Sequence, residues 1–511
     1  MTRFTTALVA LTASLGALAL VPVTGASAGS GRAEAAAHRP GTTARGTLAP
    51  GGHRTWHVLV GGQAKDQAIQ AEGYYPHVIT IDAGDTVTWT LNTEKIHAVA
   101  FTGTCQHASC FPPGCLTVKI DISPCGPPSY NGVTALDSSG RMVPPAYKWD
   151  NSVPHGDTAF SLTFTKPGVN VYFDLSVPGM RGVVIVHRAG TRYPFTQAQY
   201  SEQAREQLRS DLAAGARARN HVQPVSASAN PDGTHTLHIA LGASPPEKAR
   251  VALSPAAGAG AHGSALLVGS GIGTSLHPTI AVKIKISGLT PGSVHAVQIL
   301  LGVCRAPALT TGIVFRQIFV PPAFTLHKLT AGPGGTATST TVIAAPPKIS
   351  GPAQLRIPSS GWFINVAAGP SPDKGATSDA CGNVVFHNAA VIRYLPQNVH
   401  IQVGDTVAWT DHTSNEQHGV TFLAGHPLPR IPEWYNSTPT PNTGSYDGSS
   451  FFNSGLLTPA QAGRPCCLTL TFTRTGTFPY VDVGDFVLGM RGSVIVAPPD
   501  SHPGGAGLRR Q

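Results

Sequence analysis

The 511-residue chain has few charged residues and no concentration of charge of one sign. Asp, Glu, Lys and Arg together make up 12% of the sequence, about half of the usual share of about 25%. The net charge is +9, but no block of Lys and Arg alternates with aromatic residues. This pattern argues against a nucleic-acid partner. Beyond the N-terminus no apolar run reaches the length of a membrane span, so we expect none in the mature chain.

Recognisable catalytic motifs are also absent. The sequence has no His-x-His pair of the kind that builds a trinuclear copper site, no Gly-x-Ser-x-Gly motif and no phosphate-binding loop. No nucleophile stands beside an acid–base pair in the sequence. We therefore expect that the protein is not an enzyme.

Glycine and proline are abundant, with 57 and 44 residues. This composition argues against long helices and is typical of many short strands joined by turns. The 41% of hydrophobic residues is enough to build cores. The length corresponds to about three domains, and we predict an all-β fold class.

The N-terminus has the pattern of a secretory signal peptide. Arg3 precedes an apolar stretch from Ala7 to Val23, and Ala28 ends a small-residue cleavage site. We therefore expect a secreted, extracellular protein, in a compartment where disulfides persist.

The eight cysteines are predicted to form structural disulfides, because their spacing matches no zinc or haem motif. Cys304 and Cys381 stand alone in the middle of the chain and are expected to pair. Cys466 and Cys467 are adjacent, and either a vicinal disulfide or two buried thiols fits that spacing. Four others crowd one loop and are expected to form two bridges, in one of three pairings: Cys105, Cys110, Cys115 and Cys125.

An internal repeat organises the chain. Four motifs occur twice in the same order, at residues 84–89 and 404–409, 97–101 and 418–422, 163–168 and 471–476, and 179–182 and 489–492. The shared order predicts two copies of one β-domain. The predicted segments are a signal peptide at 1–28, a flexible arm at 29–52, a first β-domain at 53–190, a helical linker at 191–222, a middle β-sandwich at 223–385, a second β-domain at 386–497 and a tail at 498–511.

The segment between the copies contains two different patterns. Residues 194–216 carry one narrow apolar stripe, which predicts a linker helix docked on a neighbouring domain rather than a membrane or partner helix. Val282, Ile284 and Ile286 alternate with polar residues, a pattern typical of a sandwich strand. The apolar stripe of the helix consists of Tyr200, Ala204, Leu208 and Leu212.

The repeated motifs resemble those of the plastocyanin-like blue-copper proteins, the cupredoxins. The resemblance covers both repeats, about half of the chain. It rests on the Gly-Asp-Thr-Val-x-Trp strand, the following His, the Thr-Phe-Thr strand and the final Gly-Met-x-Gly. It implies two cupredoxin-like Greek-key β-sandwiches that flank the third β-sandwich, with the linker helix between them.

The resemblance also implies a copper site at one end of each copy. His97 and His418 match the first histidine ligand of the family. Met180 and Met490 match its axial methionine. In such a site two imidazoles, a thiolate and a weak axial thioether hold copper in both oxidation states.

The two copies depart from that pattern at the ligands that matter most. Asp174 and Asp482 stand where the family has its cysteine. Val177 and Asp485 stand where it has its second histidine. Because no thiolate is available, neither copy is expected to form a blue-copper centre.

Two interpretations of the remaining donors are open. In the first, they bind Cu(II), Zn(II) or a similar ion without a thiolate. In the second, the histidines and aspartates are satisfied by internal hydrogen bonds and the methionines pack in the core. The tentative metal sets are His97, Asp174 and Met180 in the first copy, and His418, Asp482, Asp485 and Met490 in the second.

The middle region is faintly similar to a chordin-type or superoxide-dismutase-like sandwich. The likeness rests on residues 288–292 and 302–304, and a fibronectin-like sandwich is the alternative. Gln298 and Leu300 stand where metal-binding histidines of a dismutase are expected, so the likeness implies fold alone.

Two hypotheses about function follow from the sequence. The first is an extracellular binding or structural module with degenerate copper sites, whose partner is an unidentified extracellular protein. The second is a copper-binding, metal-handling or electron-transfer protein with a non-blue site, whose partner is a metal donor or acceptor. Copper is the only cofactor that the resemblance implies.

Overall fold

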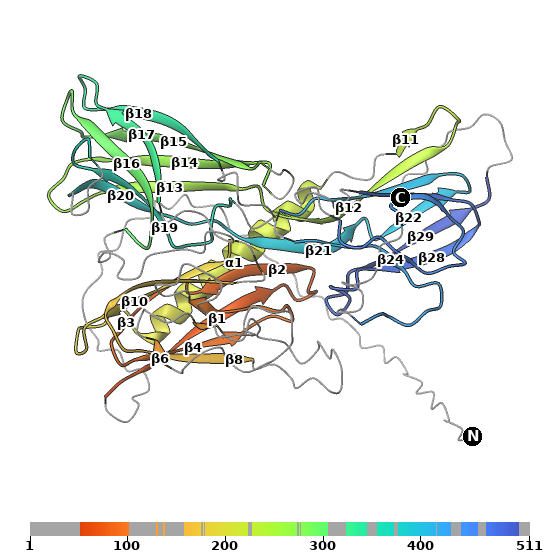
Figure 1. Cartoon of the computed structure of the whole chain (residues 1–511), viewed down its shortest axis with the longest axis horizontal. Coiled ribbons are helices and arrows are strands. Elements are labelled where there is room, and N and C mark those ends of the chain that lie inside the picture. The colour runs from red at the N-terminus through yellow and green to blue at the C-terminus, as the bar shows by residue number, and fades with distance from the viewer. Residues whose placement is uncertain are drawn as a thin grey trace, which may run out of the picture. The chain divides into compact units, whose positions relative to one another are not determined.

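The computed structural model describes residues 52–101, 129–130, 136–137, 158–174, 177, 179–222, 227–272, 275, 277–304, 323–344, 355–371, 377–414, 416–430, 441–457 and 467–499. All of them belong to one compact unit of the chain, Ala44–Gln511. Within them the protein is built from β-strands and one α-helix, α1 (Gln197–His221), so the all-β prediction is confirmed (Figure 1). The predicted signal peptide, nearly all of the arm and most of the tail lie outside the described residues. No described helix is long and apolar enough to cross a membrane.

The first repeat forms two layers of five strands around one core. One layer has the order β6-β8-β4-β1-β2 and the other β3-β10-β9-β5-β7. Trp56 and Trp89 are fully buried between them, which explains the apolar alternation of their strands. The strands are β1 (Thr55–Gln63), β2 (Ile69–Tyr75), β3 (Val78–Asp82), β4 (Thr86–Leu91), β5 (Ala100–Phe101), β6 (Ser129–Tyr130), β7 (Leu136–Asp137), β8 (Ala159–Phe164), β9 (Gly168–Phe173) and β10 (Arg181–His187).

The second repeat has the same two layers. Their orders are β25-β27-β23-β12-β21 and β22-β29-β28-β24-β26. The short β11 (Ala227–Ala229) pairs with the outer part of β12. The strands are β12 (His235–Ala243), β21 (Ala389–Leu395), β22 (Asn398–Gln402), β23 (Thr406–Asp411), β24 (Thr421–Phe422), β25 (Thr443–Tyr446), β26 (Phe452–Asn453), β27 (Cys467–Phe472), β28 (Gly476–Val481) and β29 (Arg491–Ala497).

The position of β12 (His235–Ala243) corrects the predicted start of the middle region at residue 223. The sequence analysis placed β12 in the middle region, but β12 pairs in parallel with β23 and antiparallel with β21. Ile239 and Leu241 are buried in the core of the second repeat. Figure 1 shows β12 beside the C-terminal strands. The middle sandwich is thus inserted after the first strand of this repeat, and an insertion of that length hides the link from a local pattern.

The two repeats join through equivalent edge strands. β2 and β21 pair antiparallel, with Gln70 opposite Ala390. These two residues are 320 positions apart, the same offset that relates Gly84 to Gly404. Two further bonds obey the same symmetry, from Glu72 N–H to Asn388 O and from Ile392 N–H to Ala68 O (2.9 and 2.8 Å). The two copies therefore share one continuous 11-stranded sheet, in which the two edge strands pair with each other.

Helix α1 covers the seam between β2 and β21 (Figure 1). The Tyr200 hydroxyl accepts a hydrogen bond from Thr80 N–H on the first copy (2.8 Å). The buried Asp211 accepts bonds from Tyr75 of the first copy and His387 beside the second (2.6 and 2.8 Å). The prediction of a docked linker helix is confirmed, and the helix, predicted at residues 194–216, spans Gln197–His221.

The middle region is an eight-stranded antiparallel sheet folded around its own core. The predicted Cys304–Cys381 disulfide is present. The region contacts the first repeat through Ser359, which accepts from Arg181 N–H (3.0 Å). Its strands are β13 (Lys248–Pro255), β14 (His262–Ser270), β15 (Thr279–Ser287), β16 (Val294–Leu301), β17 (Ala323–Thr330), β18 (Ala337–Ala344), β19 (Trp362–Ala367) and β20 (Ser378–Val384).

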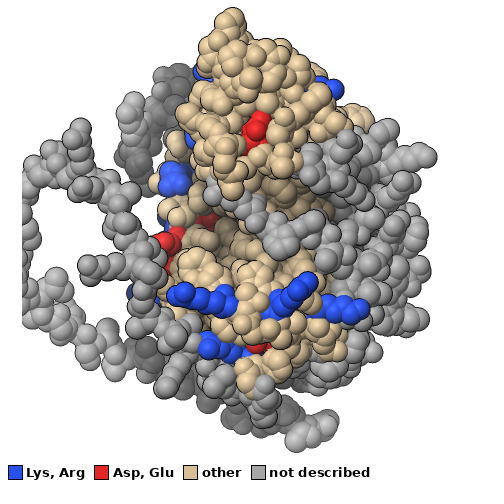
Figure 2. Space-filling view, turned by 90° about the vertical axis from the view of Figure 1, so that its left-hand side faces the viewer, with Lys and Arg blue, Asp and Glu red and all other residues tan. Residues whose placement is uncertain are grey.

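The described surface is poor in charge, as the composition predicts. On the described part of the face drawn in Figure 2, uncharged residues predominate, several Lys and Arg side chains lie near one another in the lower half, and few Asp or Glu are visible.

Candidate functional site

In the first copy, the residues at the expected copper position bond to one another. His97 lies between β4 and β5, and Asp174 follows directly on β9. His97 Nδ1 is 2.7 Å from Asp174 Oδ2. Both side chains are almost completely buried, at 1% and 0% exposure. A buried imidazole and carboxylate at this distance satisfy each other.

The carboxylate of Asp174 also holds the local backbone. Ala98 N–H donates to Oδ2 (3.1 Å), and Val177 N–H donates to Oδ1 (3.2 Å). The aspartate therefore accepts at least three hydrogen bonds and links the histidine segment to the loop before β10. These contacts match the interpretation in which Asp174 binds turn N–H groups.

The second copy repeats this arrangement and adds a carboxylate. His418 Nδ1 lies 3.4 Å from Asp482 Oδ2 and 3.1 Å from Asp485 Oδ2. Gly419 N–H donates to Asp482 Oδ2 (2.7 Å), and Asp485 N–H donates to its Oδ1 (3.1 Å). Asp482 thus plays the same part as Asp174, while Asp485 occupies the place of Val177.

The extra carboxylate changes the electrostatics of the second copy. Burial alone lowers the pKa of His418, but hydrogen bonds and charge from Asp482 and Asp485 raise it to about 10. Burial raises the pKa of Asp482. Burial also raises the pKa of nearby Asp411 to about 6. At neutral pH the imidazole of His418 therefore carries a proton, held by its contacts with Asp482 and Asp485.

The other ring nitrogen of each histidine faces a glycine. A Cβ on Gly61 would lie 2.6 Å from His97 Nε2, and one on Gly242 would lie 3.1 Å from His418 Nε2. Both Nε2 atoms are buried without a hydrogen-bond partner among the described residues. The sequence analysis missed these glycines. The signal was a repeated Thr-x-His-x-x-x-Gly, at residues 55–61 and 236–242.

A tyrosine in each copy fixes the backbone beside the histidine. The Tyr74 hydroxyl donates to Ala98 O (2.5 Å), and the Tyr394 hydroxyl donates to Gly419 O (2.7 Å). These tyrosines lie on the paired edge strands β2 and β21, so the seam between the copies positions both histidine segments. A repeated Tyr-x-Pro, at residues 74–76 and 394–396, was the available signal.

The candidate methionines lie in the cores. Met180 and Met490 have no exposed surface, and each belongs to the hydrophobic cluster of its own copy. Their backbone carbonyls accept from Asp174 N–H and Asp482 N–H (both 3.1 Å). These contacts match the interpretation in which the methionines pack.

The donor sets decide which metals fit. Blue copper needs a thiolate, and Cys304 and Cys381 are consumed in their disulfide. Cys467 is also disulfide-bonded, which rules out a free thiol there. A type 1 centre therefore does not fit the described residues. Cys466 and the four cysteines predicted to form two bridges, Cys105, Cys110, Cys115 and Cys125, lie outside the described residues.

One group of donors in the described part of the chain has the composition of a divalent-metal site. One ligand atom from each of His418, Asp482 and Asp485 lies within 4.8 Å of the other two. One imidazole and two carboxylates suit Zn(II) or Cu(II). In the first copy, the apolar Val177 takes the place of the second carboxylate, so this set is incomplete there.

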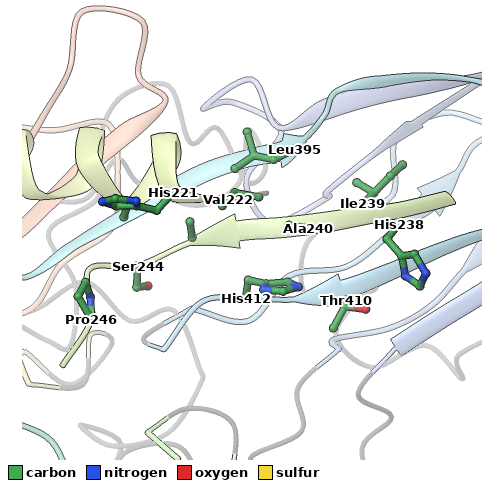
Figure 3. A pocket seen from close by; sticks show the side chains of 12 residues that line it. His221, Val222, His238, Ile239, Ala240, Ser244, Pro246, Leu395, Thr410 and His412 are labelled. Atoms are coloured by element: carbon green, nitrogen blue, oxygen red, sulfur yellow. The ribbon is translucent and has the colours of Figure 1, made fainter. Parts of the chain in front are cut away.

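A separate cavity of about 670 Å³ lies where α1 ends. His221, His238 and His412 line it, together with apolar residues of β12 and β21. Figure 3 shows the three rings at separate points along the cavity, so they do not converge on one ion. His238 is one of two histidines in a His-x-x-His pair on β12, and its partner His235 points instead toward Asp405.

Comparisons with known proteins find likeness in structure alone. No protein-family profile and no curated protein matches the chain. A reduced amicyanin mutant is 23% identical with a TM-score of 0.15, covering 29% of this chain and 95% of its own. The Cu(I) form of another amicyanin mutant is 24% identical with a TM-score of 0.14, covering 21% and 74%. Oxidised plastocyanin from Dryopteris crassirhizoma is 13% identical with a TM-score of 0.14, covering 21% and 89%. At such TM-scores the likeness carries no argument about function.

Proposed function

We propose that the chain is a secreted, cupredoxin-like module in which a buried histidine–aspartate pair has replaced the copper centre. Its two copies act as an extracellular structural or binding scaffold and carry out no electron transfer. The observation that supports this most directly is the 2.7 Å contact of His97 Nδ1 with Asp174 Oδ2, both side chains being buried.

The chemistry of that contact supports a histidine–aspartate pair that has replaced the copper centre, rather than a metal site that is merely empty. A histidine ligand must present an unprotonated nitrogen to a metal. Here a hydrogen bond occupies Nδ1, and Nε2 faces Gly61 so closely that an added Cβ would lie 2.6 Å away. The carboxylate also accepts from Ala98 N–H and Val177 N–H. The bond holds the histidine segment to the loop before β10 without an ion, so stability no longer depends on metal supply.

Metal content of the secreted full-length protein tests this proposal. The protein is loaded with copper or zinc, desalted exhaustively and analysed together with its optical spectrum. We expect no metal in the first copy and no intense band near about 600 nm, because a thiolate is required for that band. Stoichiometric metal that Asp174→Ala removes would overturn the proposal.

A second candidate function rests on the three donors of the second copy. We propose that His418, Asp482 and Asp485 bind a divalent cation once the imidazole has lost its proton. The bound ion would supply Lewis acidity or a store of metal. Asp485 has 13% of its side chain exposed, whereas His418 and Asp482 have 0% and 1%, so an ion would enter past Asp485.

One matched pair of variants distinguishes the two candidate functions. If the second copy binds metal, Asp485→Ala releases the ion while Asp174→Ala retains it. Zn(II) affinity should also rise with pH, because the ion competes with the proton on His418. Absence of retained Zn(II) or Cu(II) in the unmodified protein at both pH 7 and pH 9 would exclude the metal-handling function and leave the scaffold.

A further inference from the structure

The middle sandwich brings a serine, a histidine and an aspartate into one chain of contacts, a hydrogen bond from the serine to the histidine and an ion-pair contact from the histidine to the aspartate. Ser293 Oγ lies 2.5 Å from His295 Nε2. His295 Nδ1 lies 2.8 Å from Asp379 Oδ2. Ser293 and His295 are at the start of β16, and Asp379 is on β20. The three residues are thus brought together by the fold, and sequence analysis did not single them out.

The surroundings of His295 fix its tautomer. Nδ1 faces two acceptors, the carboxylate of Asp379 and the carbonyl of Ala367 (2.9 Å). Nδ1 therefore carries a hydrogen, and in the neutral ring Nε2 presents its lone pair to Ser293. The buried ring has 3% exposure, so its orientation is held by packing as well as by these bonds.

The serine hydroxyl has two acceptors within reach. It lies 2.5 Å from Thr290 O as well as 2.5 Å from His295 Nε2. Its single hydrogen can be donated to only one of these acceptors at a time. When it turns to Nε2, the histidine is placed to withdraw it, which is the role of a general base beside a nucleophile.

The nucleophile lies at an accessible edge. Residues 290–292 form an exposed turn directly before Ser293, which is itself half-buried. A reagent therefore reaches Oγ from the turn, while His295 and Asp379 remain behind it. This arrangement places an accessible nucleophile in front of a base, as an acyl-transfer site requires.

We propose that Ser293, His295 and Asp379 form an acyl-transfer site for activated esters. Oγ attacks the ester carbonyl while its proton passes to His295 Nε2. The C–O bond to the alcohol then breaks, and the alcohol leaves with that proton. Water next attacks the acyl-serine, gives one proton to Nε2 and releases the carboxylic acid, and the proton returns to Oγ. Asp379 stabilises the imidazolium as a positioning residue.

The backbone around Ser293 limits the substrate class. Gly292 N–H is bonded to Ala331 O (2.9 Å), and Ser293 N–H is bonded to Thr290 O (3.1 Å). Neither is free to stabilise an oxyanion, a contribution of about 10²–10³ in rate. The site is therefore suited to electrophiles with good leaving groups, such as aryl esters and fluorophosphonates, rather than to amides. This activity lies outside the scaffold function proposed for the two copies.

The same sandwich provides an internal control. Ser287 Oγ lies 3.2 Å from His262 Nε2, but His262 Nδ1 contacts Gly260 O (3.0 Å) rather than a carboxylate. Ser287 thus has a histidine without the acid and without the short contact. Any difference in reactivity between the two serines reports the effect of the complete chain of bonds.

Labelling of the full-length protein with a fluorophosphonate tests the proposal. The serine oxygen forms a P–O bond, fluoride leaves and the proton is carried away through the histidine. Peptide mass spectrometry over time measures each serine separately. We expect Ser293 to react at least about 10-fold faster than Ser287, since general-base assistance contributes about 10²–10⁴. Ser293→Ala should remove that adduct alone, and Asp379→Asn should slow it while Ser287 is unchanged.

The outcomes are distinguishable even if a variant fails to fold. The ratio of Ser293 to Ser287 labelling is measured in the unmodified protein and needs no substitution. Equal labelling of the two serines would overturn the proposal, as would an Asp379→Asn protein of native circular dichroism that labels at the original rate. Turnover of p-nitrophenyl acetate that persists in Ser293→Ala would assign the activity elsewhere.

Discussion

At the scale of single residues, close approach of a glycine to each histidine is as important as the histidine itself. Gly61 has a φ of +66°, and an added Cβ would overlap both His97 Nε2 and Thr93 Cγ2 at 2.6 Å. We predict that Gly61→Ala lowers the free energy of unfolding by about 2–5 kcal/mol, from positive-φ strain and overpacking. Gly190→Ala is the control, because its φ is +81° but nothing lies within 4 Å. Urea unfolding that gives equal losses for the two variants would contradict the proposed contact.

His418 makes stability depend on pH. Its folded pKa of about 10 exceeds the ordinary value of 6.5, so the folded state alone keeps the proton between these values. The stabilisation is complete below about pH 6.5 and is lost as pH rises through about 10. Between pH 7 and 9 we predict a loss of about 2 kcal/mol, measured by urea unfolding at each pH. His418→Gln should flatten this part of the dependence, and an unchanged slope in that variant would contradict the assignment.

At the scale of elements, both local capping residues and tertiary contacts stabilise α1. Thr196 and Gln199 form a reciprocal capping box at its start. We predict that Thr196→Ala lowers the free energy of unfolding by about 1 kcal/mol. Glu206→Ala, at an exposed position in the middle of the helix, should change it by less than about 0.5 kcal/mol. Thermal or urea unfolding followed by circular dichroism measures both, and a Glu206→Ala loss as large as that of Thr196→Ala would contradict the cap.

At the scale of the whole molecule, the insertion after β12 determines which fragments of the chain can fold. The fragment 386–499 lacks β12, which lies between β21 and β23 and contributes Ile239 and Leu241 to the core. We predict that this fragment alone shows no cooperative unfolding transition. Joining residues 227–246 to it through a flexible linker should restore one. A cooperative transition for 386–499 alone, followed by urea and circular dichroism, would show that β12 is dispensable.

A buried ion pair connects the two copies at equivalent positions. Lys95, two residues before His97, contacts Glu416, two residues before His418, and also Glu72 (Nζ–Oε1, 2.5 Å). We predict that Lys95→Met costs about 3–5 kcal/mol of stability, because it removes the cation that lies beside the fully buried Glu72.

The exposed Arg205–Glu202 pair on α1 is the matched control for Lys95. Glu202→Ala should give no measurable change in urea unfolding, since solvent screens this pair. Adding Glu72→Gln to Lys95→Met should recover part of the loss, because it removes the buried negative charge that faced the lysine. A Lys95→Met protein as stable as the Glu202→Ala protein would exclude an energetic role for the ion pair between the copies.

The sequence by itself determined what depends on local pattern: the all-β class, the four repeated motifs, the amphipathic helix and the isolated pair Cys304 and Cys381. It also determined that aspartates replace the expected thiolates, because residue identity alone decides that. Only the tertiary structure decided that β12 belongs to the second copy, that β2 pairs with β21, and that Asp379 reaches His295. These contacts join segments tens to hundreds of positions apart, and no periodicity or spacing along the chain encodes which edges meet. Their physical basis is the burial of edge strands and polar groups, which only the assembled sheets provide.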